Sequence, residues 1–228
     1  MKNLRSIIIF LLSSAFVLNL HASGTGPIYG IDISHHQGTI DWDKVREWQG
    51  NKIHFVYIKA TEGATVIDNR YTDNLAGAKD HSLLVGSYHY FKTSSSAKAQ
   101  FENFKKVAEK GKQNLIPIVD VEERGRCNMR VFHSNLKCFL DLVERHYGCK
   151  PMIYTANMFY NRYLANKYKE YKIFIGRYSK NTPMMKDNQN WCIWQFSRRG
   201  NIDGIPRDVD INIMQEKFDL SDILINNN

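Results

Sequence analysis

Short apolar runs rich in β-branched and aromatic residues alternate along the chain with longer stretches in which apolar residues recur at helical spacing. The runs VYIKA and LIPIVDV are apolar at nearly every position, which is typical of parallel strands with both faces covered. This alternation predicts an α/β fold built on parallel strands. The expected strands span residues 28–33, 53–59, 83–91, 115–121, 151–154, 173–178, 192–196 and 208–211.

Helical signals separate many of these runs. Three serines at 94–96 offer N-caps to a stretch in which Phe101, Phe104 and Val107 form an apolar stripe, and Gly111 and Gly148 mark helix ends. The expected helices span residues 41–49, 70–80, 95–110, 128–147 and 157–165. Eight strands with about five helices predict an irregular TIM-like barrel of mostly parallel strands, with few helices in its second half. Because no linker or internal repeat interrupts the pattern, we expect one catalytic barrel domain over residues 24–228.

The first residues have a different pattern. Lys2 and Arg5 precede an apolar run at 7–20, and the small residues Ala22 and Ser23 follow it. This layout predicts a signal peptide at residues 1–22, cleaved near 22–23, and hence a secreted or periplasmic protein. The run is shorter than the roughly 20 residues that cross a bilayer, so we expect no stable membrane anchor. An uncleaved N-terminal anchor is the alternative.

The net charge of the chain limits the classes of partner that it is expected to bind. The net charge of +8 over 228 residues favours anionic polymers, of which bacterial cell wall is one and nucleic acid another. No basic run with interleaved aromatic residues occurs, so we expect no nucleic-acid partner. The protein is expected to act as a monomer.

Four cysteines follow the signal segment, an even number that permits disulfides in an exported protein. Along the expected helix, Cys127 and Cys138 would lie about 16 Å apart, whereas a disulfide needs Cα atoms within about 7 Å. The same arithmetic disfavours Cys138 with Cys149. Cys149 with Cys192 is the easier pairing because both lie near strand starts.

The sequence contains no strong signal for a metal site, a cofactor or a serine nucleophile. No CxxC pair occurs, and His35 and His36 lack accompanying ligands at metal-binding spacing. No GxSxG elbow is present. His89 lies mid-strand and is expected to be a packed, hydrogen-bonded histidine. We therefore expect neither a metal nor a cofactor.

Polar residues end nearly every expected strand. In a parallel barrel the carboxyl ends of the strands meet at one face, where such folds place their sites. Asp32, Asp120 and Asp210 interrupt apolar runs, and a buried carboxylate is costly unless it is paired or used. Asp120 and Glu122 lie two residues apart on one strand and so share a face. Close carboxylates raise one pKa, which gives the proton donor and the anion that glycoside cleavage requires.

Aromatic residues near the strand ends suit a sugar site, because their flat faces and polar tips fit pyranose rings. Strand propensity also enriches aromatic residues, so packing in the core or rim is the alternative for each. These residues are Tyr88, Tyr90, Tyr154, Tyr178 and Trp194.

Seven short motifs occur in a specific order between Tyr29 and Asn212: YGIDISHHQG, FVYIKATEG, GSYHYF, PIVDVE, PMIYT, WQF and DVDIN. Each is weak alone, but the ordered set resembles the Chalaropsis-type lysozymes of glycoside hydrolase family 25. The resemblance implies an eight-stranded barrel with fewer helices. It also implies hydrolysis of the β-1,4 bond between N-acetylmuramic acid and N-acetylglucosamine in the glycan strands of bacterial peptidoglycan.

The resemblance also implies roles for residues in the matching motifs. Glu122 would be the general acid, and Asp120 would orient and stabilise the substrate's own N-acetyl group as nucleophile, an exception to the two-carboxylate scheme. A covalent bond to Asp120 is left open. The residues expected to bind substrate are Asp32, Asp210, Tyr57, Glu62, Tyr88, Tyr154 and Gln195.

Some positions depart from the family pattern. His36, Phe174, Gly176 and Met214 replace residues more usual in the family, which affects the packing of sugar subsites rather than the chemistry. Two other functions remain as alternatives: a peptidoglycan-binding protein without turnover, and a chitinase-like glycosidase on the same barrel.

Overall fold

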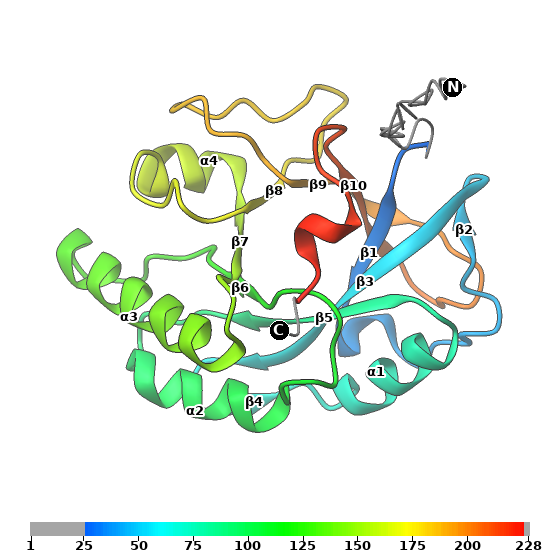
Figure 1. The fold of residues 1–228 in the computed structure, drawn as a ribbon, viewed down its shortest axis with the longest axis horizontal. Coiled ribbons are helices and arrows are strands. Elements are labelled where there is room, and N and C mark those ends of the chain that lie inside the picture. Colours follow the sequence, from blue (N-terminus) through cyan, green and yellow to red (C-terminus); the bar gives the residue numbers. More distant parts are fainter. Residues whose placement is uncertain (1–25, 226–228) are drawn as a thin grey trace, which may run out of the picture.

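The structure, a computed structural model, describes residues 26–225. Eight strands close into a barrel, because the first of them pairs with both its neighbours in the ring (Figure 1). The predicted α/β barrel of eight mostly parallel strands is confirmed. Around the ring the strands are β1 (Tyr29–Ile33), β10 (Val209–Met214), β9 (Ile193–Gly200), β8 (Ile173–Gly176), β7 (Met152–Ala156), β6 (Ile118–Asp120), β5 (Leu84–Tyr90) and β3 (Asn51–Glu62).

One strand of this barrel runs against the others. β10 is antiparallel to both β1 and β9, whereas the other neighbouring pairs in the ring are parallel. The sequence analysis places Asp210 at a barrel face formed by the carboxyl ends of strands, but Asp210 lies near the start of its strand. Because β10 is reversed, its start reaches that same face, and Asp210 lies opposite Asp32 in the ladder.

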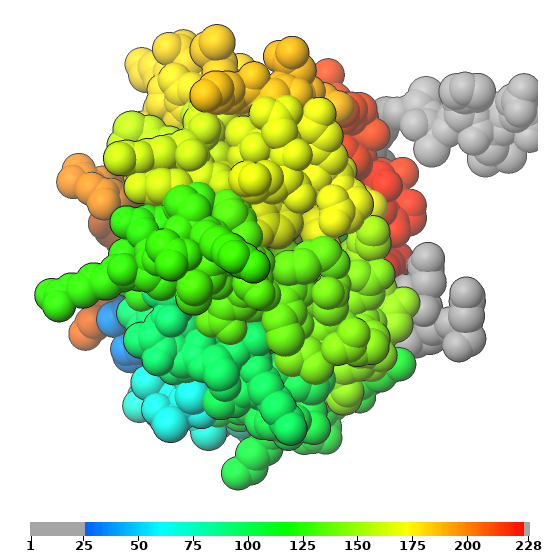
Figure 2. Space-filling view, turned by 90° about the vertical axis from the view of Figure 1, so that its left-hand side faces the viewer, coloured from blue at the N-terminus to red at the C-terminus, as the bar shows by residue number. Residues whose placement is uncertain are grey.

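Helices follow four of the strands and cover the barrel. They are α1 (Tyr71–Asp80), α2 (Ala97–Val107), α3 (Met129–Tyr147) and α4 (Asn157–Phe159), the last continuing into a π-helical turn at Tyr160–Leu164. Ser96 and Asn128 cap α2 and α3 by accepting backbone N–H bonds, and Gly148 ends α3 in the left-handed conformation. Figure 2 shows this side of the molecule, where green segments lie below and yellow segments above them.

The expected helix at 41–49 is wrong. A turn lies at residues 42–44, and β2 (Glu47–Trp48) forms a hairpin with the start of β3. Trp42 and Val45 have helical spacing and are buried, but Gln49 and Gly50 both adopt positive φ, as a two-residue hairpin turn requires. The small strand β4 (Val66–Ile67), which pairs with the end of β3, was also not predicted.

Two apolar clusters stabilise the barrel. The larger lies between the strands and the helices and includes the buried face of α3. The smaller fills the barrel interior below the site, where Tyr57, Ile118 and Phe174 connect it to the pocket lining. Its other members include Phe55, Met152, Cys192 and Ile223. The C-terminal segment closes this end, since the backbone N–H of Ile116 donates to the carbonyl of Ile223 at 2.8 Å. It is the red segment in Figure 1.

The expected disulfides are absent among the described residues, because Cys127, Cys138, Cys149 and Cys192 are all free thiols. Cys149 and Cys192 both pack against the interior cluster, as their positions near strand starts suggest. A disulfide also requires particular Cβ directions, which position along the chain does not fix.

The expected signal peptide at residues 1–22 lies outside the described residues. Between residues 26 and 225, no helix has the length and apolar character needed to cross a bilayer.

Candidate active site

A pocket of about 230 Å³ opens at the barrel end where the carboxylates meet. Eight of the nine predicted site residues line it; Glu62 does not. The lining residues are Asp32, Tyr57, Lys59, Tyr88, Tyr90, Ile118, Asp120, Glu122, Tyr154, Phe174, Tyr178, Gln195 and Asp210. The structure therefore brings together carboxyl groups from β1, β6, β10 and the segment after β6.

Asp120 is the last residue of β6 and is only 7% exposed. Burial raises the pKa of its carboxyl well above the ordinary value, and the charges of Glu122 and Asp32 add to this. Its Oδ1 is buried and has no hydrogen-bond partner within the described residues. An unpartnered oxygen that borders a pocket can accept a hydrogen bond from a bound ligand.

Glu122 lies two residues further along, at the mouth of the pocket, where its side chain is exposed. Partial desolvation and the charge of Asp32 raise the pKa of Glu122, while Tyr154 and Lys59 oppose the rise. A carboxyl with a raised pKa holds its proton closer to neutral pH, and this one is accessible to a substrate. Glu122 therefore meets both requirements of a general acid.

Gln195 organises the opposite wall. The hydroxyl groups of Tyr154 and Tyr178 donate to its Oε1 at 2.7 and 2.8 Å, which fixes the amide orientation. Its Nε2 then donates to Asp32 Oδ2 at 2.9 Å, and Asn212 Nδ2 donates to the same oxygen at 2.9 Å. This wall is thus satisfied by hydrogen bonds before any ligand binds.

Asp32 and Asp210 form a second close pair of carboxyls. Burial raises the pKa of Asp32, although its hydrogen bonds with Gln195 and Asn212 oppose the rise. Burial, then the charges of Asp32 and Glu122, raise the pKa of Asp210 to about 8. We interpret Asp32 as the ionised member, because two amide donors stabilise its charge and no side chain between residues 26 and 225 donates to Asp210.

Aromatic rings form the floor and sides of the pocket. Tyr57 is fully buried and its hydroxyl donates to the carbonyl of Ile116 at 3.3 Å. Phe174 packs edge-on against Tyr154, with ring centroids 5.0 Å apart. Tyr88 and Tyr90 add faces from β5. Flat apolar surfaces with polar groups around them suit the rings of a saccharide.

The sequence analysis left some lining residues without a role. Tyr90 and Tyr178 are aromatic residues near strand ends, and Lys59 is the last residue of the expected strand at 53–59, so each has a position that indicates the site. Ile118 is an apolar member of a strand, and nothing in the sequence separates it from core residues. Phe174 departs from the family pattern and was expected to affect the packing of sugar subsites, which agrees with its place in the lining. Trp194 does not line the pocket; it is 9% exposed and its indole N–H donates to the Arg177 carbonyl at 2.8 Å.

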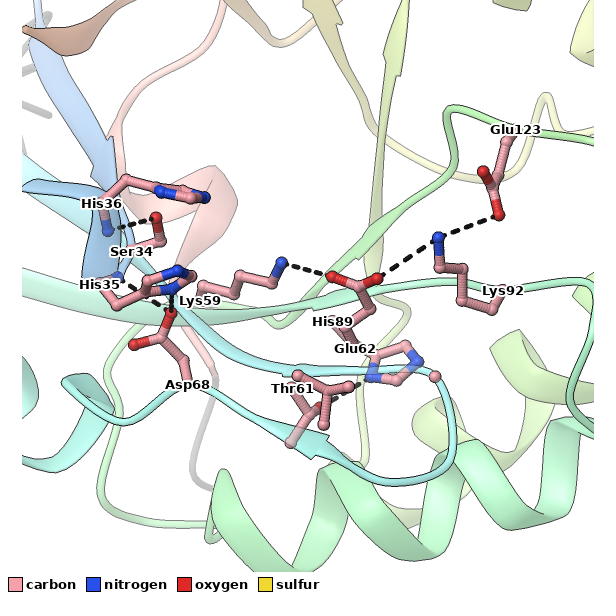
Figure 3. Close-up of polar contacts among 12 residues, drawn as sticks. Ser34, His35, His36, Lys59, Thr61, Glu62, Asp68, His89, Lys92 and Glu123 are labelled. Atoms are coloured by element: carbon pink, nitrogen blue, oxygen red, sulfur yellow. Dashed lines mark hydrogen bonds and ion pairs between the residues drawn. The ribbon is translucent and has the colours of Figure 1, made fainter.

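The histidines lie outside the lining. His89 is fully buried and bonds to Thr61 and Gln100, as expected for a packed histidine. His35 pairs with Asp68 at 2.8 Å, seen at the left of Figure 3. Within residues 26–225, no three His, Cys, Asp or Glu side chains cluster as a metal site would require.

Comparison with known proteins identifies the family of this chain. The sequence profile of "Glycosyl hydrolases family 25" matches residues 31–205, which include Asp32, Asp120 and Glu122, whereas Asp210 lies just beyond the matched range. The chain belongs to glycosyl hydrolase family 25. It is therefore a glycoside hydrolase.

Relatives and solved structures extend the likeness over most of the chain. "Uncharacterized protein YegX" of Escherichia coli K12 is 35% identical over 201 residues, 87% of this chain and 73% of that protein. The "Autolytic lysozyme" of Clostridium acetobutylicum is 29% identical over 82% of this chain and 56% of its own length. A family 25 glycosyl hydrolase from Bacillus anthracis superposes with a TM-score of 0.75 at 30% identity, covering 83% of this chain and 90% of that one.

Proposed function

We propose that this family 25 enzyme is a lysozyme that hydrolyses the β-1,4 bond between N-acetylmuramic acid and N-acetylglucosamine in bacterial peptidoglycan. The observation that carries the proposal is the pair of Asp120 and Glu122. One carboxyl is buried with an unpartnered oxygen, and the other is accessible with a raised pKa, so the two are suited to different tasks. The similarity to a protein named an autolytic lysozyme supports the choice of substrate.

In this mechanism Glu122 protonates the glycosidic oxygen as the bond from that oxygen to the sugar's anomeric carbon breaks. The carbonyl oxygen of the sugar's own 2-acetamido group attacks that carbon and gives a cyclic intermediate. Water then opens the intermediate and returns a proton to Glu122. Substrate participation of this kind is a known departure from the two-carboxylate scheme.

Asp120 would accept a hydrogen bond from the acetamido N–H and stabilise the positive charge that develops on this group, and that charge in turn favours the ionised form of Asp120 against the effect of burial on its pKa. Its free Oδ1 provides the acceptor, and its burial strengthens the interaction by excluding water. Asp32, Asp210, Tyr57, Tyr88, Tyr154 and Gln195 would shape the sugar subsites around this centre.

Export and a monomeric state belong to the proposal as well. Peptidoglycan lies outside the cytoplasmic membrane, so the enzyme must leave the cytoplasm, and residues 1–22 have the pattern of a signal peptide. N-terminal sequencing of the exported protein would locate the cleavage that we expect near residues 22–23.

Digestion of purified peptidoglycan, followed by borohydride reduction and mass analysis, tests the reaction. We expect products that end in reduced N-acetylmuramic acid. Binding to the wall without soluble products would contradict the proposal, and release of chito-oligosaccharides from chitin at a comparable rate would point to a chitinase-like enzyme instead.

Glu122→Gln tests the general acid, because it removes the proton and keeps the shape. We expect turnover to fall by a factor of about 100 or more while binding to the wall persists. Glu109→Gln, a surface acid outside the pocket, is the matched control and should keep normal turnover. We also expect the pH optimum to lie below neutral, so a rate still rising at pH 9 would contradict the role of Glu122.

A further inference from the structure

Lys59 is the one cation among the residues that line the pocket, where it shares the lining with four carboxyl groups. Its side chain is only 13% exposed, so its charge is poorly screened by water. A cation in this position favours the ionised form of every carboxyl near it. An acid catalyst needs the opposite, a carboxyl that keeps its proton.

Glu62 binds this cation from outside the pocket. Lys59 Nζ donates to Glu62 Oε2 at 2.7 Å. Glu62 also pairs with Lys92 at 3.3 Å, and Lys92 pairs with Glu123 at 3.2 Å, so alternating charges connect the ends of β3, β5 and β6 (Figure 3). The Lys59 side chain in Figure 3 extends along the strand toward Glu62.

An irregularity in β3 makes this contact possible. In a regular strand, residues three apart point to opposite faces. The register between β3 and β5 shifts between Lys59 and Thr61, which inserts one extra residue and returns Glu62 to the face of Lys59. Thr61 instead faces the buried His89, to which it bonds at 2.7 Å.

The ring of Tyr90 holds the two lysines in place. Lys59 Nζ lies 5.3 Å and Lys92 Nζ 4.9 Å from the ring centroid, both within the range of a cation–π contact. The ammonium of Lys59 is therefore held by the Glu62 carboxylate and the Tyr90 ring, and not by Asp120 or Glu122.

We propose that Glu62 is a positioning residue, which holds the Lys59 ammonium away from Asp120 and Glu122 and so allows Glu122 to keep the proton it donates. This inference rests on the proposed role of Glu122 as general acid. It replaces the expectation that Glu62 binds substrate, because Glu62 does not line the pocket. The directions of the pKa shifts agree with this role of Glu62. The charge of Lys59 lowers the pKa of both Asp120 and Glu122, whereas the charge of Glu62 raises that of Asp120.

Opposite substitutions in this pair should move the pH profile in opposite directions. Lys59→Met removes the cation, so the basic limb of kcat/KM should move to higher pH by about half a pH unit or more. Glu62→Gln frees the ammonium, so the limb should move to lower pH by a similar amount. Because Glu62 acts through Lys59, the double variant should keep the upward shift of Lys59→Met, and Glu62→Asp should restore most of the wild-type profile.

The other charged and titratable groups around the pocket stay the same in all these variants, so the differences isolate the pair. These groups are Asp32, His36, Tyr88, Tyr90, Lys92, Glu123, Tyr154, Tyr178, Arg198 and Asp210.

Glu109 and Lys112 provide a matched control. They form an ion pair of the same spacing and the same 2.7 Å length on the exposed surface, so Glu109→Gln and Lys112→Met should leave the profile unmoved. Thermal unfolding of each variant verifies that it is folded, and Lys59→Arg, which keeps the charge, replaces Lys59→Met if the latter does not fold; its limb should then stay near that of the wild type.

Two results would overturn the inference. In the first, Glu62→Gln leaves the basic limb of kcat/KM in place or moves it to higher pH. The other is a higher KM for Glu62→Gln with an unmoved limb, which would make Glu62 a substrate ligand after all. Failure of the proposed function would give a different result. If Glu122→Gln kept normal turnover, Glu122 could not be the general acid.

Discussion

The two ends of the barrel interior use the same strands for opposite purposes. Along β3, Phe55, Tyr57 and Lys59 lie at alternate positions and carry the interior from an apolar bottom, through the pocket floor, to a charged mouth. The bottom is sealed by the C-terminal segment and filled with apolar side chains. The mouth contains four carboxyl groups, and burial is the largest cause of the raised pKa of each.

The closed end therefore stabilises the fold, whereas the open end destabilises it. Apolar burial at the closed end stabilises the barrel by roughly 25 cal/mol for each Å² removed from water. Crowded carboxyl groups at the open end destabilise it, because like charges and desolvation both disfavour ionisation. The predictions below alter one end at a time.

The largest effect is expected at the open end, from Asp120→Asn. Turnover on peptidoglycan should fall on the order of 1000-fold, because the charge that stabilises the intermediate is lost. The melting temperature should rise, since the variant removes a buried like charge. A variant with normal turnover would contradict the role of Asp120, and a clear loss of stability would contradict the account of the open end.

Phe55→Ala at the closed end should reverse this pattern. The ring is fully buried in the interior cluster, so its loss should lower the free energy of unfolding by about 3–5 kcal/mol. Chemical denaturation measures this change. Well below the melting temperature, the pH profile of turnover should match that of the wild type, and a shifted profile would mean that the two ends are not independent.

Gln195→Leu should affect both activity and stability to an intermediate degree. The change leaves Asp32 with one amide donor and removes the acceptor shared by Tyr154 and Tyr178. We expect a loss of about 1–3 kcal/mol in the free energy of unfolding, together with reduced turnover. An unchanged stability would show that the ordered wall is not held by this amide.

The smallest expected effect is the pH dependence of stability. A carboxyl whose pKa is raised on folding stabilises the fold fully below its unfolded pKa of about 4, and this stabilisation is lost as pH rises through the folded pKa. For Asp210 that folded pKa is about 8, so the melting temperature should fall as pH rises from about 4 toward 8.

Asp210→Asn provides the control for this trend and should flatten the fall. Carboxyls with lowered pKa, such as Glu62 and Asp187, act in the opposite sense and lose their stabilisation as pH falls below about 4. A melting temperature that rises between pH 5 and 8 would contradict the raised pKa values at the open end.

Much of the architecture and most of the pocket could be predicted from local pattern. Continuous apolar runs identify the eight strands because buried parallel strands tolerate few polar residues, and a carboxylate inside such a run indicates a site. The helix at 41–49 failed because Trp42 and Val45 fit a helical period, and a hairpin turn at Gln49 and Gly50 overrides that period.

By itself, the sequence determined the barrel, its family and the residues Asp32, Asp120, Glu122 and Asp210, because each interrupts or follows an apolar run in a recognisable motif. Only the tertiary structure decided that β10 is reversed, that the cysteines remain thiols and that Glu62, which lies outside the pocket lining, pairs with Lys59. These three features depend on strand direction, on Cβ geometry and on a one-residue shift in β3. Each is set by pairing between segments far apart in the chain, which local periodicity does not encode.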